Sequence, residues 1–135
     1  MATSVTTYNP SSIWPVPEAF RTIYSHASET VAGARTLYIS GQVGIAPDGT
    51  LPAGFAEQAQ IAMTNVESLL ATADMSLANL VKLTFYLTRA EDAPALVEIR
   101  QARWGSATPP TVTALTVSAL VRPELLIEID AIAAA

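Results

Sequence analysis

Polar side chains that could do chemistry interrupt otherwise apolar segments at three places in the chain. These are Tyr24-Ser25-His26, Ser40-Gly41-Gln42, and Glu128 with Asp130. Glu128 stands between Ile127 and Ile129, where an ionised carboxylate is costly unless it is paired or hydrogen-bonded. Burial of this kind raises the pKa of a carboxyl group and suits the group to proton transfer. The alternative is an ordinary acid on an edge strand in contact with water.

The other candidate residues each have a structural and a functional interpretation. His26 can titrate near neutral pH, but a lone histidine more often makes structural hydrogen bonds. Gly41 allows a ligand or another backbone to approach closely, or it marks a β-bulge. Trp14 and Trp104 are interpreted as packing or interface anchors.

The composition excludes several classes of protein. The 135 residues contain no cysteine and one histidine, which leaves no disulfide, no thiolate nucleophile and no cysteine-built or histidine-rich metal site. A net charge of −5 argues against a surface that follows nucleic-acid phosphates. No apolar stretch approaches the about 20 residues of a membrane span, and the first residues carry no positive charge. We therefore expect a cytoplasmic protein that uses no cofactor. We also expect this protein to bind neither nucleic acid nor membranes.

Hydrophobic periodicity predicts one α+β domain over residues 1–135, with the element order β-β-α-β-α-β-β. Residues 1–19 form an extended, proline-rich arm. Strands are predicted over residues 20–27, 36–46, 81–88, 113–120 and 125–132, and helices over residues 55–73 and 92–105. Gly33 suits a hairpin turn between the first two strands, and Asp92 can cap the second helix. Two helices cover one face of a single sheet, so the other face needs a partner, most simply a second copy.

In their order along the chain, several of these segments resemble the motifs of the Rid family, also called YjgF/UK114. The matching segments are Tyr24-Ser25-His26-Ala27, Ser40-Gly41-Gln42, Val81-Lys82-Leu83-Thr84 and Ile127-Glu128-Ile129-Asp130-Ala131-Ile132-Ala133. The resemblance extends from Tyr24 to the end of the chain. It implies a chorismate-mutase-like α+β fold in a homotrimer, with the sheets facing the trimer centre and three clefts between subunits.

The resemblance also implies an activity and a set of site residues. The best-known members of the family hydrolyse reactive enamines and imines, releasing ammonia and a keto acid. Tyr24 and Glu128 are the expected catalytic residues, which help to place and activate water. The expected substrate-binding residues are Ser40, Gln42, His26, Val112 and Ala114, with no metal.

Three positions differ from the family pattern in ways that change the expected substrate. In the family, an arginine in a P-A-R-S/T sequence clamps the substrate carboxylate, and this chain has Val112 at that position. A later position that is often cysteine in the family is Ala114 here. A polar position on the second helix is Val97 here. Valine donates no hydrogen bond, which makes amino-acid-derived imines poor candidates. A neutral or aromatic electrophile is expected instead.

Two functions follow from this sequence. The first is a Rid-like enzyme with a non-standard substrate, and the alternative is a non-catalytic metabolite-binding or chaperone-like trimer. Arg100 and Arg103 lie on the second predicted helix near Glu98, which is typical of a solvated helix face. They are the first candidates if another group replaces the missing arginine.

Overall fold

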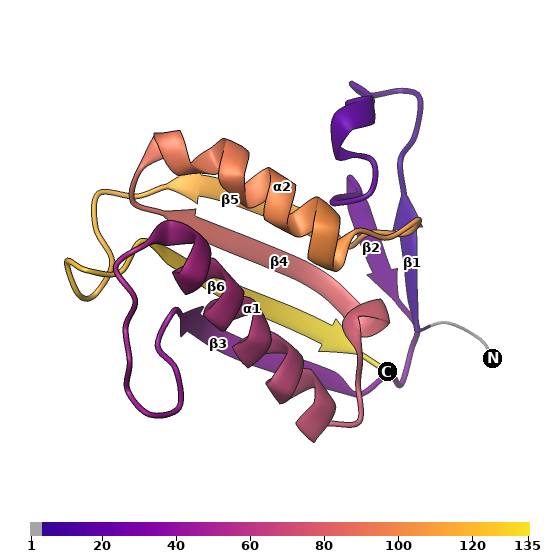
Figure 1. Ribbon diagram of the computed structural model, residues 1–135. Helices are drawn as coiled ribbons and strands as arrows, with labels where there is room; N and C mark the ends of the chain where they lie inside the picture. Colours follow the sequence, from indigo (N-terminus) through magenta and orange to yellow (C-terminus); the bar gives the residue numbers. More distant parts are fainter. Residues whose placement is uncertain (1–3) are drawn as a thin grey trace.

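The structure is a computed structural model that describes residues 4–135. A four-stranded mixed sheet has the strand order β3-β6-β4-β5, in which β5 runs parallel to β4 and the other pairs are antiparallel. Its strands are β3 (Thr36–Val43), β4 (Leu80–Leu87), β5 (Thr111–Thr116) and β6 (Ile127–Ala134). The helices α1 (Phe55–Thr72) and α2 (Ala93–Trp104) lie across one face of this sheet (Figure 1). The expected α+β fold with two helices on one face is confirmed.

The N-terminal segment differs from the prediction. β1 (Val5–Tyr8) pairs with β2 (Ala27–Thr30) in a separate two-stranded ribbon beside the main sheet (Figure 1). The strand predicted over residues 20–27 is wrong, because Glu18–Phe20 is a short 3-10 helix and the Phe20 carbonyl accepts hydrogen bonds from the N–H groups of Ile23 and Tyr24. The apolar side chains of this segment anchor turns instead of following a pleat.

The hairpin predicted at Gly33 is also wrong, since β2 and β3 belong to different sheets. Gly33 has a φ of +81°, the left-handed conformation that glycine adopts most readily, and it turns the chain from one sheet to the other. A glycine turn between two apolar segments is typical of a hairpin, but the β2 strand pairs with a segment that lies about twenty residues upstream.

The core lies between α1 and the sheet. The buried residues of α1 recur at the predicted spacing of three and four, and they are Phe55, Gln58, Ala59, Ala62, Met63, Val66 and Leu70. They pack against fully buried side chains of the sheet such as Phe85, Ile127 and Ile129. The buried Gln58 amide donates to the carbonyls of Pro52 and Glu124 and accepts from the Leu126 N–H, so it joins α1 to two loops.

The second helix has the predicted ends but not the predicted cap. α2 follows Asp92 and stops before Gly105, with Pro94 in its first turn. Asp92 has a helical backbone conformation and makes no side-chain cap. Its carboxylate instead accepts hydrogen bonds from Arg89 at 2.8 and 3.1 Å. The capping prediction failed because the 3-10 turn Ala90–Asp92 leads directly into the helix.

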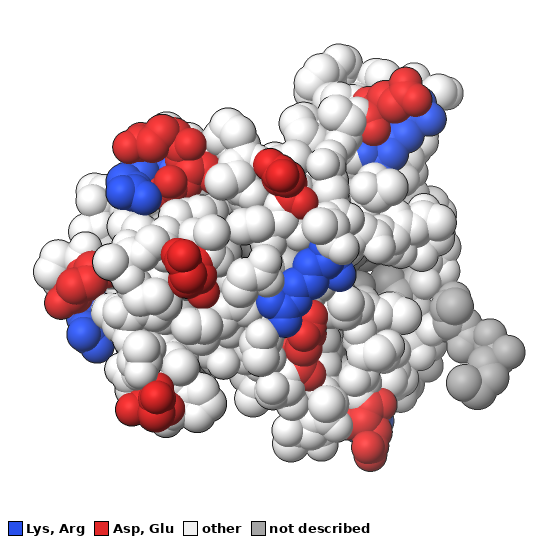
Figure 2. Space-filling model, in the orientation of Figure 1, with Lys and Arg blue, Asp and Glu red and all other residues white. Residues whose placement is uncertain are grey.

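The face of the sheet opposite the helices is open and mixed in polarity. Tyr38 is 76% exposed on this face. Two polar contacts also lie there: the Lys82 ammonium donates to the Thr113 hydroxyl at 2.7 Å, and the Tyr86 hydroxyl donates to Asp130 at 2.7 Å. The helix-covered side, which Figure 2 shows in the orientation of Figure 1, carries charged side chains in small separate groups among wide uncharged areas. Among residues 4–135, no helix has the length and apolar character needed to cross a membrane.

Candidate functional site

A cavity of about 200 Å³ lies between α2, β5 and the segment before β2. Its walls come from residues that are far apart in the sequence: Phe20, Ile23, Tyr24, Val97, Arg100, Val112 and Ala114. Tyr24, Val112 and Ala114 were expected from the sequence to line a substrate cleft, and the cavity brings these three together. We call it the Val112 cavity.

Ser25 holds Tyr24 beside β5. The Ser25 side chain is 2% exposed, and its hydroxyl donates to the Pro109 carbonyl at 2.6 Å. Its N–H donates to the Pro110 carbonyl at 2.9 Å, and the residue forms a parallel bridge with Thr111 at the start of β5. Three contacts at one residue leave the neighbouring Tyr24 little freedom to move away from Val112, so the Tyr24-Ser25-His26 motif includes an anchor that the sequence interpretation did not single out.

His26 does not face the Val112 cavity. Its ring Nε2 donates to the Trp14 carbonyl at 2.7 Å, and its N–H donates to the Asn9 side chain at 2.8 Å. The ring meets that of Tyr24 edge-on, with 5.8 Å between the centroids. His26 and Tyr24 also line a second cavity of about 390 Å³ under the N-terminal segment. These contacts fit the structural interpretation of this histidine, because both of its polar links hold the N-terminal segment in place.

Ser40, Gln42 and Glu128 gather around Gly41 at a different place. The pairing of β3 with β6 changes register between Ile39 and Gln42, which makes a bulge of the Ser40-Gly41 pair. The Glu128 carboxylate lies directly against Gly41, where a Cβ would overlap it. Gly41 is thus needed for a close approach, and the approaching group is the predicted catalytic acid itself.

Glu128 and the Val112 cavity lie on opposite faces of one sheet. Val112 pairs with Leu83, and Ala114 pairs with Phe85, so these side chains share the helix-covered face. Glu128 alternates with the buried Ile127 and Ile129 and therefore points to the open face. Within residues 4–135 the Glu128 carboxylate makes no hydrogen bond to Tyr24 or Ser40. One protomer alone does not bring all the expected site residues together.

Arg100 lines the Val112 cavity, although the sequence suggested it only as one of two candidates to replace the missing arginine. It is 6% exposed, so the solvated helix face expected for it is wrong. Its guanidinium lies over the Phe85 ring at 4.6 Å and donates to the Ile23 carbonyl at 2.7 Å. Burial lowers the pKa of Arg100 to about 10, which leaves it protonated at neutral pH. The signal was its spacing of four residues from Leu96 and from Trp104, which places it on the buried stripe of α2.

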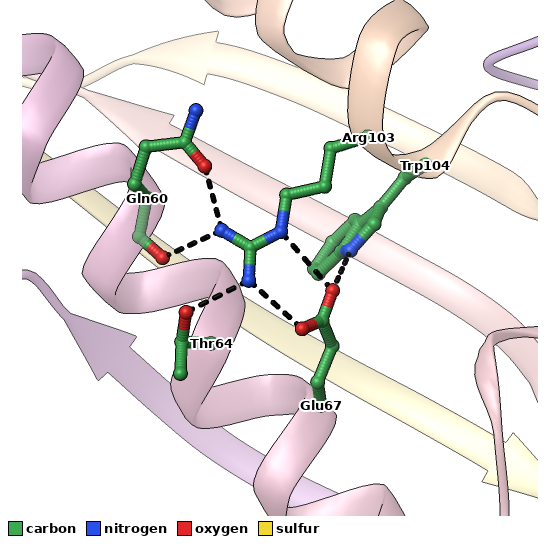
Figure 3. Close-up of polar contacts among 5 residues, drawn as sticks. All are labelled: Gln60, Thr64, Glu67, Arg103 and Trp104. Atoms are coloured by element: carbon green, nitrogen blue, oxygen red, sulfur yellow. Dashed lines mark hydrogen bonds and ion pairs between the residues drawn. The ribbon is translucent and has the colours of Figure 1, made fainter.

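Arg103, three residues later, joins the two helices. Its guanidinium donates to the Gln60 backbone and side chain, to the Thr64 hydroxyl and to both oxygens of Glu67 (Figure 3). The Trp104 indole N–H donates to Glu67 at 2.7 Å. Burial alone would raise the pKa of Glu67, but hydrogen bonds from Arg103 and Trp104 and the charge of Arg103 hold it below its ordinary value. We call these five residues the interhelix clamp.

Comparisons with known proteins show similarity in both sequence and fold. Residues 17–135 match the family model described as Endoribonuclease L-PSP. The 2-iminobutanoate/2-iminopropanoate deaminase of Capra hircus is 37% identical over 108 residues, covering 78% of this chain and 77% of the relative. The structure of YyfB from Yersinia pestis, a Rid family protein of unknown function, aligns over 98% of this chain and 99% of its own, with 31% identity and a TM-score of 0.86. The chain belongs to the Rid family.

The Rid match includes every residue that lines the Val112 cavity, since the matched range begins before Phe20. A second solved Rid structure, Escherichia coli TdcF with bound serine, has a TM-score of 0.67 and 26% identity and covers 85% of this chain and 94% of its own. In the described part of this Rid protein, His, Asp and Glu side chains form no group of three or more that could hold a metal ion.

Proposed function

We propose that this Rid protein is a deaminase-like hydrolase that acts on a C=N bond of a small molecule, in a cleft shared between copies of the chain. The observation that carries the proposal is the Val112 cavity, which joins Tyr24 to Val112 and Ala114 at positions matched by the family resemblance. The relatives named as 2-imino acid deaminases support the same class of reaction.

The proposed reaction adds water and removes ammonia. The water oxygen attacks the carbon of the C=N bond while the Glu128 carboxylate takes a proton from the water and passes it to the nitrogen. Glu128 then takes the hydroxyl proton of the carbinolamine and passes it to the amine nitrogen, the C–N bond breaks to release ammonia, and a C=O group and an ionised Glu128 remain. The Tyr24 hydroxyl orients the water or the substrate nitrogen, and Ser40 and Gln42 contact the substrate from the Glu128 side.

The shared cleft requires an oligomer, and we propose a homotrimer. The homotrimer is supported by the positions of Glu128 and Val112, whose side chains lie on opposite faces of the sheet. Both residues can act on one substrate only if Glu128 comes from a second copy. β5 is the last strand of the sheet, and Ala114 on it is exposed, so the cavity opens where a neighbour can approach. We expect light scattering at micromolar concentration to give three times the 14.2 kDa chain mass, and a stable monomer would contradict the shared cleft.

The substrate body is proposed to be small and apolar or aromatic, because Phe20, Val97 and Val112 supply apolar walls. The prediction of a neutral substrate rested on the missing arginine at Val112, together with the loss of polar residues at Ala114 and Val97. Since a guanidinium lies in the same cavity, the lack of an arginine at that position no longer argues against an acid.

Ammonia release tests the proposed reaction directly. 2-Iminobutanoate is generated in the assay from the amino acid by an amino acid oxidase, and the rate of ammonia release is compared with and without the protein. We expect the protein to accelerate release, and the same rate in both reactions would contradict a hydrolase. Saturable binding without acceleration would instead favour the alternative function, a non-catalytic metabolite-binding or chaperone-like trimer.

A further inference from the structure

Arg100 carries a buried positive charge that forms no ion pair with an acidic side chain of residues 4–135. The ion pairs of the described residues involve Arg89, Arg103 and Arg122, and none of them includes Arg100. Of its three guanidinium-group nitrogens, one Nη donates to the Ile23 carbonyl, and the other two donate to no described residue. A buried charge of this kind is destabilising unless something compensates it.

The free donors of Arg100 reach open space. No fully buried side-chain nitrogen in residues 4–135 lacks a hydrogen-bond partner, so the two unpartnered nitrogens of Arg100 keep some accessible surface. Arg100 lines the Val112 cavity and also an adjoining one of about 220 Å³ beside Trp104. The Phe85 ring and the Ile23 carbonyl hold the guanidinium between the two.

We infer that Arg100 receives the carboxylate of the substrate in the Val112 cavity, which makes the substrate a small acid with an apolar body. This inference rests on the proposed function for the identity of the substrate, and on the geometry of α2 for the residue. An anion in the cavity would accept hydrogen bonds from the donors that are free and would neutralise the buried charge.

The cation of the Val112 cavity lies on a different wall from the one that the family resemblance implies. The family resemblance implies an arginine on β5, whereas here β5 contributes the apolar Val112 and α2 contributes Arg100. A guanidinium on α2 turns the carboxylate toward the helix and leaves the apolar body of the substrate beside Val112. Arg100 is thus a specificity-determining residue on the buried stripe of α2, where the sequence predicted a solvated helix face.

Binding measured without turnover tests the inference separately from the proposed reaction. Calorimetry compares 2-oxobutanoate with the neutral ketone 2-butanone on the full-length protein. We expect the wild type to bind the acid at least about tenfold more tightly, the effect of one charge-assisted hydrogen bond. Equal affinity for the two probes would overturn the inference even if ammonia release is observed. A preference for the acid without ammonia release would refute only the proposed hydrolysis.

Two substitutions connect the preference to this side chain. Arg100→Met, of similar length and without charge, should abolish the preference for the acid and leave the affinity for 2-butanone unchanged. Arg100→Lys, which keeps the charge but not the planar fork, should retain a reduced preference and guards against a folding defect in the first variant. If both folded variants bind 2-oxobutanoate as the wild type does, Arg100 is not the carboxylate-binding residue.

A second-site substitution tests the geometry. Val112→Arg in the Arg100→Met background places a guanidinium on β5, on the opposite wall of the same cavity. We expect the preference for the acid to return at least partly, because the new cation reaches the same enclosed space. Arg103→Lys serves as the matched control, since it alters an arginine of the same helix outside the cavity and should leave the preference unchanged.

Discussion

Two arginines of α2, three residues apart, have opposite environments. Arg103 donates five hydrogen bonds to α1 residues, two of them to the Glu67 carboxylate (Figure 3). Arg100 donates one, to a backbone carbonyl, although it is the more deeply buried of the two. A cation whose donors are all used contributes to the packing of the helices, while a buried cation with free donors beside a cavity remains available to a ligand.

The comparison separates stability from activity. Substitutions in the interhelix clamp should change the free energy of unfolding and leave turnover by the folded protein unaltered. Substitutions around the proposed site should do the reverse.

The largest effect is expected from Glu128→Gln. The variant keeps the shape of the side chain and removes the proposed base, so the rate of ammonia release should fall by about 10²- to 10⁴-fold. The thermal midpoint and the oligomer mass should stay unchanged. Asp130→Asn, two residues along the same strand, is the matched control and should retain most of the activity. Full activity in Glu128→Gln would show that this acid is structural.

A smaller loss of activity is expected from Gly41→Ala. The new Cβ overlaps the end of the Glu128 side chain, which is flexible and gives way, so the carboxylate moves without being lost. Turnover should fall by about tenfold, the effect of about 1.4 kcal/mol at the transition state. At Gly44 a Cβ would instead overlap the backbone of Gln58 in α1. Gly44→Ala should therefore lower the thermal midpoint, and the reverse pattern in the two variants would contradict this assignment.

Arg103→Met should lower the free energy of unfolding by about 2 kcal/mol, because it leaves Glu67 and the Gln60 carbonyl without their charged donor. Urea denaturation measures the change. Glu98→Gln, at an exposed position of the same helix, is the control and should have no effect. The KM for the imine substrate should be the same as in the wild type, and an increase in KM would show that the clamp and the site are coupled.

The smallest expected effect concerns the acid stability of the clamp. The pKa of Glu67 is lowered in the folded protein, so its contribution to stability is complete above its ordinary pKa of 4.5 and is lost as the pH falls through the folded value. Denaturation midpoints measured from pH 6 down to pH 3 should fall more steeply in the wild type than in Glu67→Gln. Parallel curves would mean that the Arg103 and Trp104 contacts do not stabilise the ionised form.

Elements with a strong local period could be predicted from the sequence. The helix α1, the strand β4 and both ends of α2 agree with the alternation and spacing of their apolar residues. The β1 and β2 pairing could not be predicted, because it joins segments separated by a long proline-rich stretch and neither strand has an apolar face. Local composition at Gly33 indicated a turn correctly but contained no information about which strands it joins.

The candidate site, like the fold, could be predicted from the sequence only in part. The motifs that contain Tyr24, Gly41 and Glu128 and their order along the chain were sufficient to identify the family and to nominate site positions. Only the tertiary structure decided that Glu128 and Val112 face opposite sides of the sheet, and that Arg100 enters the cavity while Arg103 joins the helices. Helix periodicity assigns each arginine to a face but does not say what the face meets. That depends on contacts between α1, α2 and β5, and these form only when distant parts of the chain pack together.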